Sequence, residues 1–180
     1  MAKKAAAKRG TGKMAVKVAT KKKVAAENTV QSATERREAE AALNGLVQKF
    51  AESQTRLIAA VRKVLRKRLP TAHELVYEYR DCFVISYSPN GHGYEGLFGL
   101  RGSSEGVKLY FNRGKELPDP NKLLKGSGTM ARSLDVEKAS VLTKPEVVSL
   151  IDAALAMNSI PFEPTGKGSV TVRPTKASRR

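Results

Sequence analysis

The stretch LVYEYRDCFVISYS, residues 75–88, decides the fold, because its apolar and polar residues alternate with a period of two. Successive side chains of a β-strand point to opposite faces of a sheet, so this alternation predicts strand structure. Arg80 and Asp81 interrupt the pattern, and the stretch is either one bent strand or two short strands that meet there. Further along, VKLYFN (107–112) repeats the alternation and predicts a strand with one buried face.

Two weaker segments extend this strand region. Residues 97–101 and 132–136 each have the composition of a short strand. The loops 88–96 and 102–106 are short and rich in turn residues. Short loops favour hairpins, so we expect an antiparallel meander.

Helical periodicity precedes the strands. Apolar residues recur every three or four positions from Leu43 to Leu69, after Ser32 and Glu35, which have the spacing of a capping box. Residues 53–55 favour a division of this segment into two helices.

A further helix follows the strands. Thr143 and Glu146 have capping-box spacing, Pro145 lies in the expected first turn, and Asn158 marks the end. The order of elements predicts an α+β domain, with a small antiparallel sheet and helices packed on one of its faces.

The charge of the chain is concentrated at its two ends. Of the net charge of +16, residues 1–23 carry +9 and residues 164–180 carry +5. Residues 1–23 contain no aromatic residue, Leu or Ile, and such a segment cannot bury enough apolar surface to offset the entropy of ordering it. We therefore divide the chain into a disordered Lys/Ala-rich arm (1–31), an α+β domain (32–163) and a basic C-terminal tail (164–180).

The cations of the arm are candidate nucleic-acid-binding residues, because closely spaced positive charges interact with phosphates. They are Lys3, Lys4, Lys8, Arg9, Lys13, Lys17, Lys21, Lys22 and Lys23. A second basic cluster ends the second expected helix and has two interpretations: a nucleic-acid contact, or cations favoured by the negative end of the helix dipole. Its members are Arg62, Lys63, Arg66, Lys67 and Arg68.

Other features narrow the class of protein. A single cysteine, Cys82, cannot form a disulfide within the chain, and no apolar run is long enough to span a membrane. We expect a cytoplasmic protein, although an acid-free N-terminus is also found in mitochondrial transit peptides.

His73 and His92 lack metal-site spacing, and the GxGxxG match at 91–96 precedes an expected strand where the dinucleotide motif requires a helix. The sequence predicts neither a cofactor nor a resident metal, and it predicts no catalytic residue.

The strand at 107–112 also predicts a small-anion pocket. If Val107, Leu109 and Phe111 face the helices, Lys108 and Tyr110 face the other way. Gly99 on a neighbouring strand would leave a shallow space there, and Arg132 would complete the pocket, which favours an anion. An ordinary solvated sheet face is the alternative.

From about Leu57 onward the chain resembles the YdhG-like domain family. The resemblance is carried by a series of short motifs in order, and the chain offers no single diagnostic one. They are Leu69-Pro70, Glu74–Tyr77, Tyr87-Ser88-Pro89, Val107–Phe111, Leu117–Pro120 with Leu123-Leu124, Gly126–Gly128 with Arg132, and Gly166–Gly168. The resemblance implies a compact α+β domain of unknown function, and it supplies no catalytic residues. Some members of the family are linked to iron handling and likened in role to frataxin.

These observations lead to three hypotheses. The first is a non-enzymatic binding protein whose basic arm holds nucleic acid or another polyanion non-specifically. The second is a small-ligand or iron-handling domain, although iron sites need clustered carboxylates and the acids here are scattered. The third is an enzyme with Glu78, Lys108, Tyr110 and Arg132 converging on the open sheet face.

Overall fold

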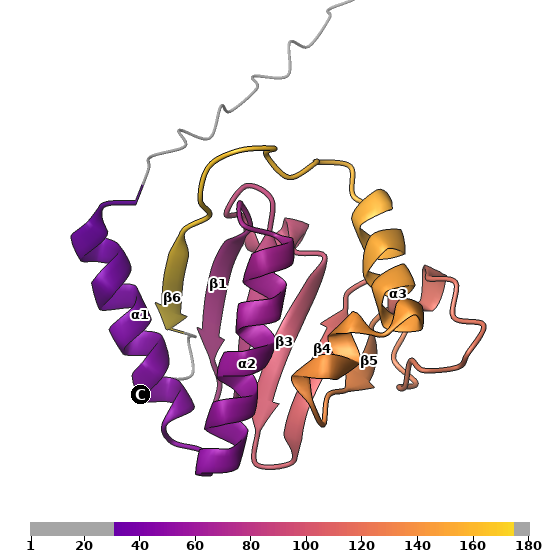
Figure 1. The fold of residues 1–180 in the computed structure, drawn as a ribbon, viewed down its shortest axis with the longest axis horizontal. Coiled ribbons are helices and arrows are strands. Elements are labelled where there is room, and N and C mark those ends of the chain that lie inside the picture. Colours follow the sequence, from indigo (N-terminus) through magenta and orange to yellow (C-terminus); the bar gives the residue numbers. More distant parts are fainter. Residues whose placement is uncertain (1–30, 175–180) are drawn as a thin grey trace, which may run out of the picture.

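The computed structural model describes residues 31–174, which form three α-helices and one six-stranded sheet (Figure 1). The helices are α1 (Ala33–Val47), α2 (Glu52–Arg68) and α3 (Pro145–Ala156). The strands are β1 (His73–Glu78), β2 (Cys82–Ser88), β3 (Phe98–Ser103), β4 (Gly106–Phe111), β5 (Arg132–Asp135) and β6 (Val170–Pro174). The α+β class expected from the sequence is confirmed.

The sheet has the order β5-β4-β3-β2-β1-β6. Strands β1 to β5 pair as the expected antiparallel meander, and β6 lies parallel to β1. The stretch 75–88 forms two strands, because the chain turns between Glu78 and Cys82. In that turn the amide of Tyr79 donates to the carbonyl of Cys82 over 2.8 Å.

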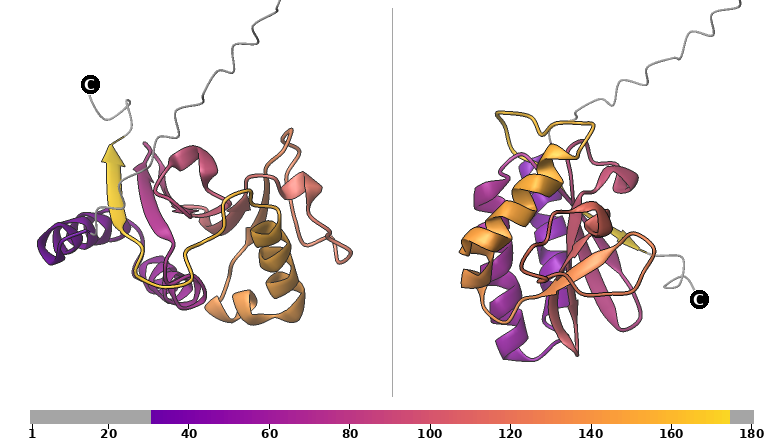
Figure 2. Two further views of the ribbon diagram at one scale, coloured as in Figure 1. Left: turned by 90° about the horizontal axis from the view of Figure 1, so that it is seen from above. Right: turned by 90° about the vertical axis from the view of Figure 1, so that its right-hand side faces the viewer.

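All three helices cover the same face of the sheet (Figure 2). The side chains that alternate toward them build the core, which includes Val76, Ile85, Leu100 and Leu109, each fully buried. Burying a side chain of this size contributes about 1.5–3 kcal/mol. The opposite face carries no α-helix of the described chain.

The helix termini confirm one predicted cap and correct another. Ser32 and Glu35 form the expected capping box at the start of α1. At α3, however, Lys144 occupies the N-cap position and no side chain caps the helix. Thr143 belongs to a preceding 3-10 turn, η3 (Ala139–Thr143), and its hydroxyl donates to the carbonyl of Ser140 instead. The spacing alone could not reveal this turn.

A buried ionic contact joins α1, α2 and β1. Arg62 donates to both oxygens of Glu74 and to Glu40, over distances of 2.6 to 3.0 Å. The Glu74 side chain is only 3% exposed, and a buried carboxylate needs such a partner. Burial lowers the pKa of Arg62, but its hydrogen bonds to Glu74 and Glu40 outweigh burial and raise that pKa above its ordinary value.

The assignment of residues 164–180 to a tail outside the domain is partly wrong, because residues 170–174 form strand β6. Val170 pairs with Glu74, and the two valines Val170 and Val172 extend the core. Gln31, which we assigned to the arm, exchanges two hydrogen bonds with the backbone of Val170. The folded domain therefore begins before residue 32 and extends beyond residue 163. Residues 1–30, which hold the rest of the predicted arm, lie outside the described part of the chain.

Gly168 allows β6 to approach the chain before β1. A Cβ atom at this position would lie 1.7 Å from the carbonyl oxygen of Ala72, a distance no side chain can adopt. The Gly168 amide donates to the carbonyl of Pro70 over 3.1 Å. Only glycine permits this close backbone contact.

We predict that Gly168→Ala destabilises the domain by about 2 kcal/mol or more, because the backbone must separate to admit the methyl group. Gly45 is the matched control, since it lies in α1 with no atom near its missing Cβ. Gly45→Ala should stabilise by about 0.5–1 kcal/mol. Urea unfolding followed by circular dichroism measures both, and equal midpoints for the two variants would contradict this packing.

Candidate anion-binding face

The face of the sheet that lacks helices is closed over β1 and β2 but open over β3, β4 and β5. The loop between β2 and β3, which includes the 3-10 turn η1 (Gly93–Glu95), folds back over β1 and β2 (Figure 2). A Cβ atom on Gly93 would lie 2.1 Å from the Tyr77 hydroxyl, and one on Gly96 would lie 2.2 Å from the Ser86 hydroxyl. The glycines of the GxGxxG match therefore serve close packing of this loop.

Strand register brings charged side chains together on the open part of this face. Arg101 on β3 pairs with Lys108 on β4, which pairs with Asp135 on β5. Tyr110 lies two residues further along β4, between Gly99 and Ser133. Neighbouring strands are about 4.8 Å apart, so these side chains form one continuous patch.

We call this patch the cationic face and define it as Arg101, Lys108, Tyr110, Lys125 and Asp135. Asp135 is the single acid of this set. One of its carboxylate oxygens lies 2.8 Å from the amine of Lys125, and the other lies 3.8 Å from the amine of Lys108. Arg101 forms no ion pair with any residue of the described chain. The five residues of the cationic face thus carry three positive charges and one negative charge, and Glu137 is a second acid near enough to raise the pKa of Lys125.

Arg101 is half-buried between two polar side chains. Contact with the Cys82 thiol, and to a lesser extent with the Tyr110 hydroxyl, raises the pKa of Arg101 despite its partial burial. Neither of these neighbours is a carboxylate. The guanidinium charge is therefore permanent and uncompensated, and it is available to an anion.

The pKa values around Asp135 follow from its two lysines. The hydrogen bond from Lys125 is the main cause that lowers the pKa of Asp135, and the charge of Lys108 adds to it. The same contact raises the pKa of Lys125. Asp135 and Lys125 are therefore both ionised at neutral pH.

The structure places two of the three predicted pocket residues together. Lys108 and Tyr110 both lie on the open face, and Gly99 lies opposite Tyr110, as expected. The space above Gly99 is occupied, however, because Val84 approaches within 3.0 Å of the missing Cβ. The space that we expected above Gly99 is therefore filled by Val84.

Arg132 does not join them. It pairs with Phe111, whose side chain is in the core, so Arg132 belongs to the other side of β5 from Ser133. Its guanidinium donates to the carbonyls of Gly128 and Ala131 over 2.6 and 2.7 Å. The predicted convergence of Arg132 with Lys108 and Tyr110 is wrong.

Glu78 is also absent from the open face, which corrects the arrangement expected for an enzyme. It lies on the helix side of β1, where the amine of Lys49 donates to its carboxylate over 2.7 Å. Arg101 takes the place that we expected Arg132 to fill. Pairing residues 97–101 with 107–111 in the correct register would have placed Arg101 beside Lys108, but the weak strand pattern there did not define that register.

The basic cluster at the end of α2 is largely neutralised. Arg62 and Arg66 bind Glu40 and Glu74, and Arg68 forms an ion pair with Asp152. Lys63 and Lys67 are exposed and have no acidic partner within residues 31–174. Most of these cations therefore hold the domain together. The nine predicted arm cations, Lys3 to Lys23, lie outside the described residues.

The described residues contain neither a group of metal ligands nor a membrane-spanning helix. Between residues 31 and 174 no three His, Cys, Asp or Glu side chains are grouped so that they could hold a metal ion. No helix in that range has the length and apolar character needed to cross a membrane. The chain also matches no protein-family model, no curated protein and no solved structure.

We predict that Asp135 titrates below the ordinary aspartate pKa of about 3.9. Because the folded pKa is the lower one, its stabilising contribution is complete above about pH 4 and is lost as the pH falls through the folded value. Lys125→Gln should raise the midpoint more than Lys108→Gln, since Lys125 is the closer cation. Carboxyl-carbon NMR titration measures these midpoints, and the reverse order would contradict the geometry.

Proposed function

We propose that this protein is a non-enzymatic binding protein that holds nucleic acid or another polyanion without sequence specificity. The observation that carries the proposal is the cationic face, where three cations and the acid Asp135 lie on a part of the sheet that no α-helix of the described chain covers. The basic N-terminal segment adds nine positive charges without an acid in residues 1–23. Binding through such charges gains free energy from the release of counterions.

The arrangement of the cationic face favours an extended ligand over a single small anion. Its cations come from β3, β4 and the segment beside β5, so they are spread across the sheet. Tyr110 lies among them and is half-exposed, which offers an aromatic surface to a base. Stacking on an aromatic side chain, combined with cations along a backbone, is the usual basis of sequence-independent binding to single strands.

The resemblance to the YdhG-like family supports a related proposal, that residues from about 57 onward are a domain of that kind acting in the cytoplasm. Its α+β fold agrees with what the resemblance implies. Iron handling is the alternative that the resemblance brings. Titrating the full chain with ferrous iron tests that alternative directly, and saturable binding would replace the polyanion proposal.

We predict that affinity for a labelled DNA falls steeply with salt. With about five phosphates engaged on a duplex, log K against log salt should have a slope of about −4.5, because each contact contributes about −0.9. Changing all nine arm cations, Lys3 to Lys23, to glutamine should remove most of this slope. Fluorescence anisotropy across a range of salt concentrations measures it.

A double variant tests how much the cationic face contributes to the salt dependence of DNA binding. The double variant Arg101→Gln/Lys108→Gln should reduce the slope by about 2. Lys63→Gln/Lys67→Gln removes the same charge from α2 on the helix side and is the matched control. Its slope should change less. If the two double variants bound equally, the cationic face would not be the binding surface.

A further inference from the structure

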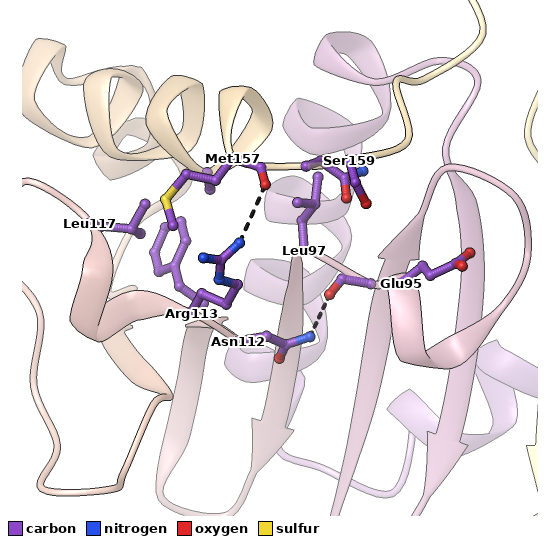
Figure 3. Close-up of a pocket in the computed structure, with 11 residues that line it drawn as sticks. Glu95, Leu97, Asn112, Arg113, Leu117, Met157 and Ser159 are labelled. Atoms are coloured by element: carbon purple, nitrogen blue, oxygen red, sulfur yellow. Dashed lines mark hydrogen bonds between the residues drawn. The ribbon is translucent and has the colours of Figure 1, made fainter. Parts of the chain in front are cut away.

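A cavity lies at the end of the sheet where β3 begins and β4 ends, beneath the C-terminal end of α3 (Figure 3). Its volume is about 260 Å³. The 3-10 turn η2 (Gly114–Glu116) and the residue that follows it form one side. This cavity is separate from the cationic face, and none of the residues of that face lines it.

One part of the cavity wall is apolar and is formed by Leu97, Phe111, Leu117, Ala154 and Met157. The rest of the lining is mostly polar and includes Asn158 and Ser159. Phe111, Leu117 and Ala154 are buried, so their positions are fixed by the core. An apolar cavity of about 150 Å³ is large enough for benzene. The apolar part of a ligand here can therefore be one aromatic ring or a short chain.

One charged side chain extends across the mouth of the cavity. Figure 3 shows Arg113 directed toward the carbonyl of Met157, and the distance from its Nη1 is 3.4 Å. Its Nε and Nη2 donate to the exposed carboxylate of Glu116. A guanidinium has five N–H donors, so one hydrogen on Nη1 and one on Nη2 remain, and the long contact to Met157 is easily replaced.

Glu95 and Asn112, two other polar residues that line the cavity, are held by hydrogen bonds within the chain. The Glu95 side chain points away from Arg113 in Figure 3 and is held by the Asn90 amide. The Asn112 amide nitrogen donates to the carbonyl of Gly96 over 2.5 Å, which fixes that side chain at the rim. Arg113 is thus the one cation among the described residues that line the cavity, and Glu116, which binds it, is not among them.

We propose that this cavity binds a small monocarboxylate. Its ring or short chain lies against the apolar part of the wall, and its carboxylate accepts hydrogen bonds from the two remaining donors of Arg113. Two charge-assisted hydrogen bonds at the entrance of a partly apolar cavity select for a carboxylate over a neutral or positive group of the same shape.

The test is a titration of the full-length protein with phenylacetate, followed by backbone amide shifts in NMR. We expect saturable shifts at Leu97, Ala154 and Met157. Phenylacetamide, which has the same shape without the charge, should bind with an affinity at least about tenfold lower. Benzylamine, which carries the opposite charge, should give no saturable shift.

Two variants locate the interaction. Arg113→Gln should weaken phenylacetate binding by about tenfold or more, because it removes the charged donors. Lys115→Gln is the control, since it removes the same charge from an exposed neighbour that does not line the cavity. The proposal is overturned if phenylacetate gives no saturable shift, if Arg113→Gln binds it unchanged, or if the shifts appear only at Arg101 and Lys108.

Discussion

Side chains of β3, β4 and β5 alternate between a face packed against helices and a face that meets solvent, and this alternation governs the rest of the structure. On β4 it sends Leu109 and Phe111 into the core and Lys108 and Tyr110 outward. A register slip of one residue would exchange the two sets and place a lysine in the core. The cationic face therefore exists because the apolar core fixes the register behind it.

The two faces of the sheet differ in whether their arginines are paired with acids. On the helix side, Arg62 is held between two carboxylates, Glu40 and Glu74, which makes it part of the framework that joins α1, α2 and β1. On the open side, Arg101 has a thiol and a hydroxyl for neighbours and keeps its charge uncompensated. The sequence alone does not distinguish these two arginines. Their roles differ because, within the described residues, the fold places carboxylates beside Arg62 and none beside Arg101.

Local patterns were sufficient for much of this fold. Alternation and loop length predicted the meander, and the direction of Lys108 and Tyr110 followed from the apolar residues between them. Strand β6 was missed because its partner, β1, is almost a hundred residues away, and a short segment of Val and Thr near a basic end gives no local sign of pairing. The side of β5 on which Arg132 lies depends on a pairing register that its weak pattern did not fix, and the same uncertainty hid Arg101.

The central claim, that the open sheet face binds a polyanion, is tested most directly by mapping a bound oligonucleotide onto the folded domain. The measurement is an NMR titration of the full chain with a short oligothymidylate, following the Tyr110 ring and the side chains of Arg101 and Lys108. We predict that these signals shift together and saturate, with smaller changes along α2. The absence of shifts at Tyr110, Arg101 and Lys108, or shifts that occur mainly around Lys63 and Lys67, would contradict this binding surface.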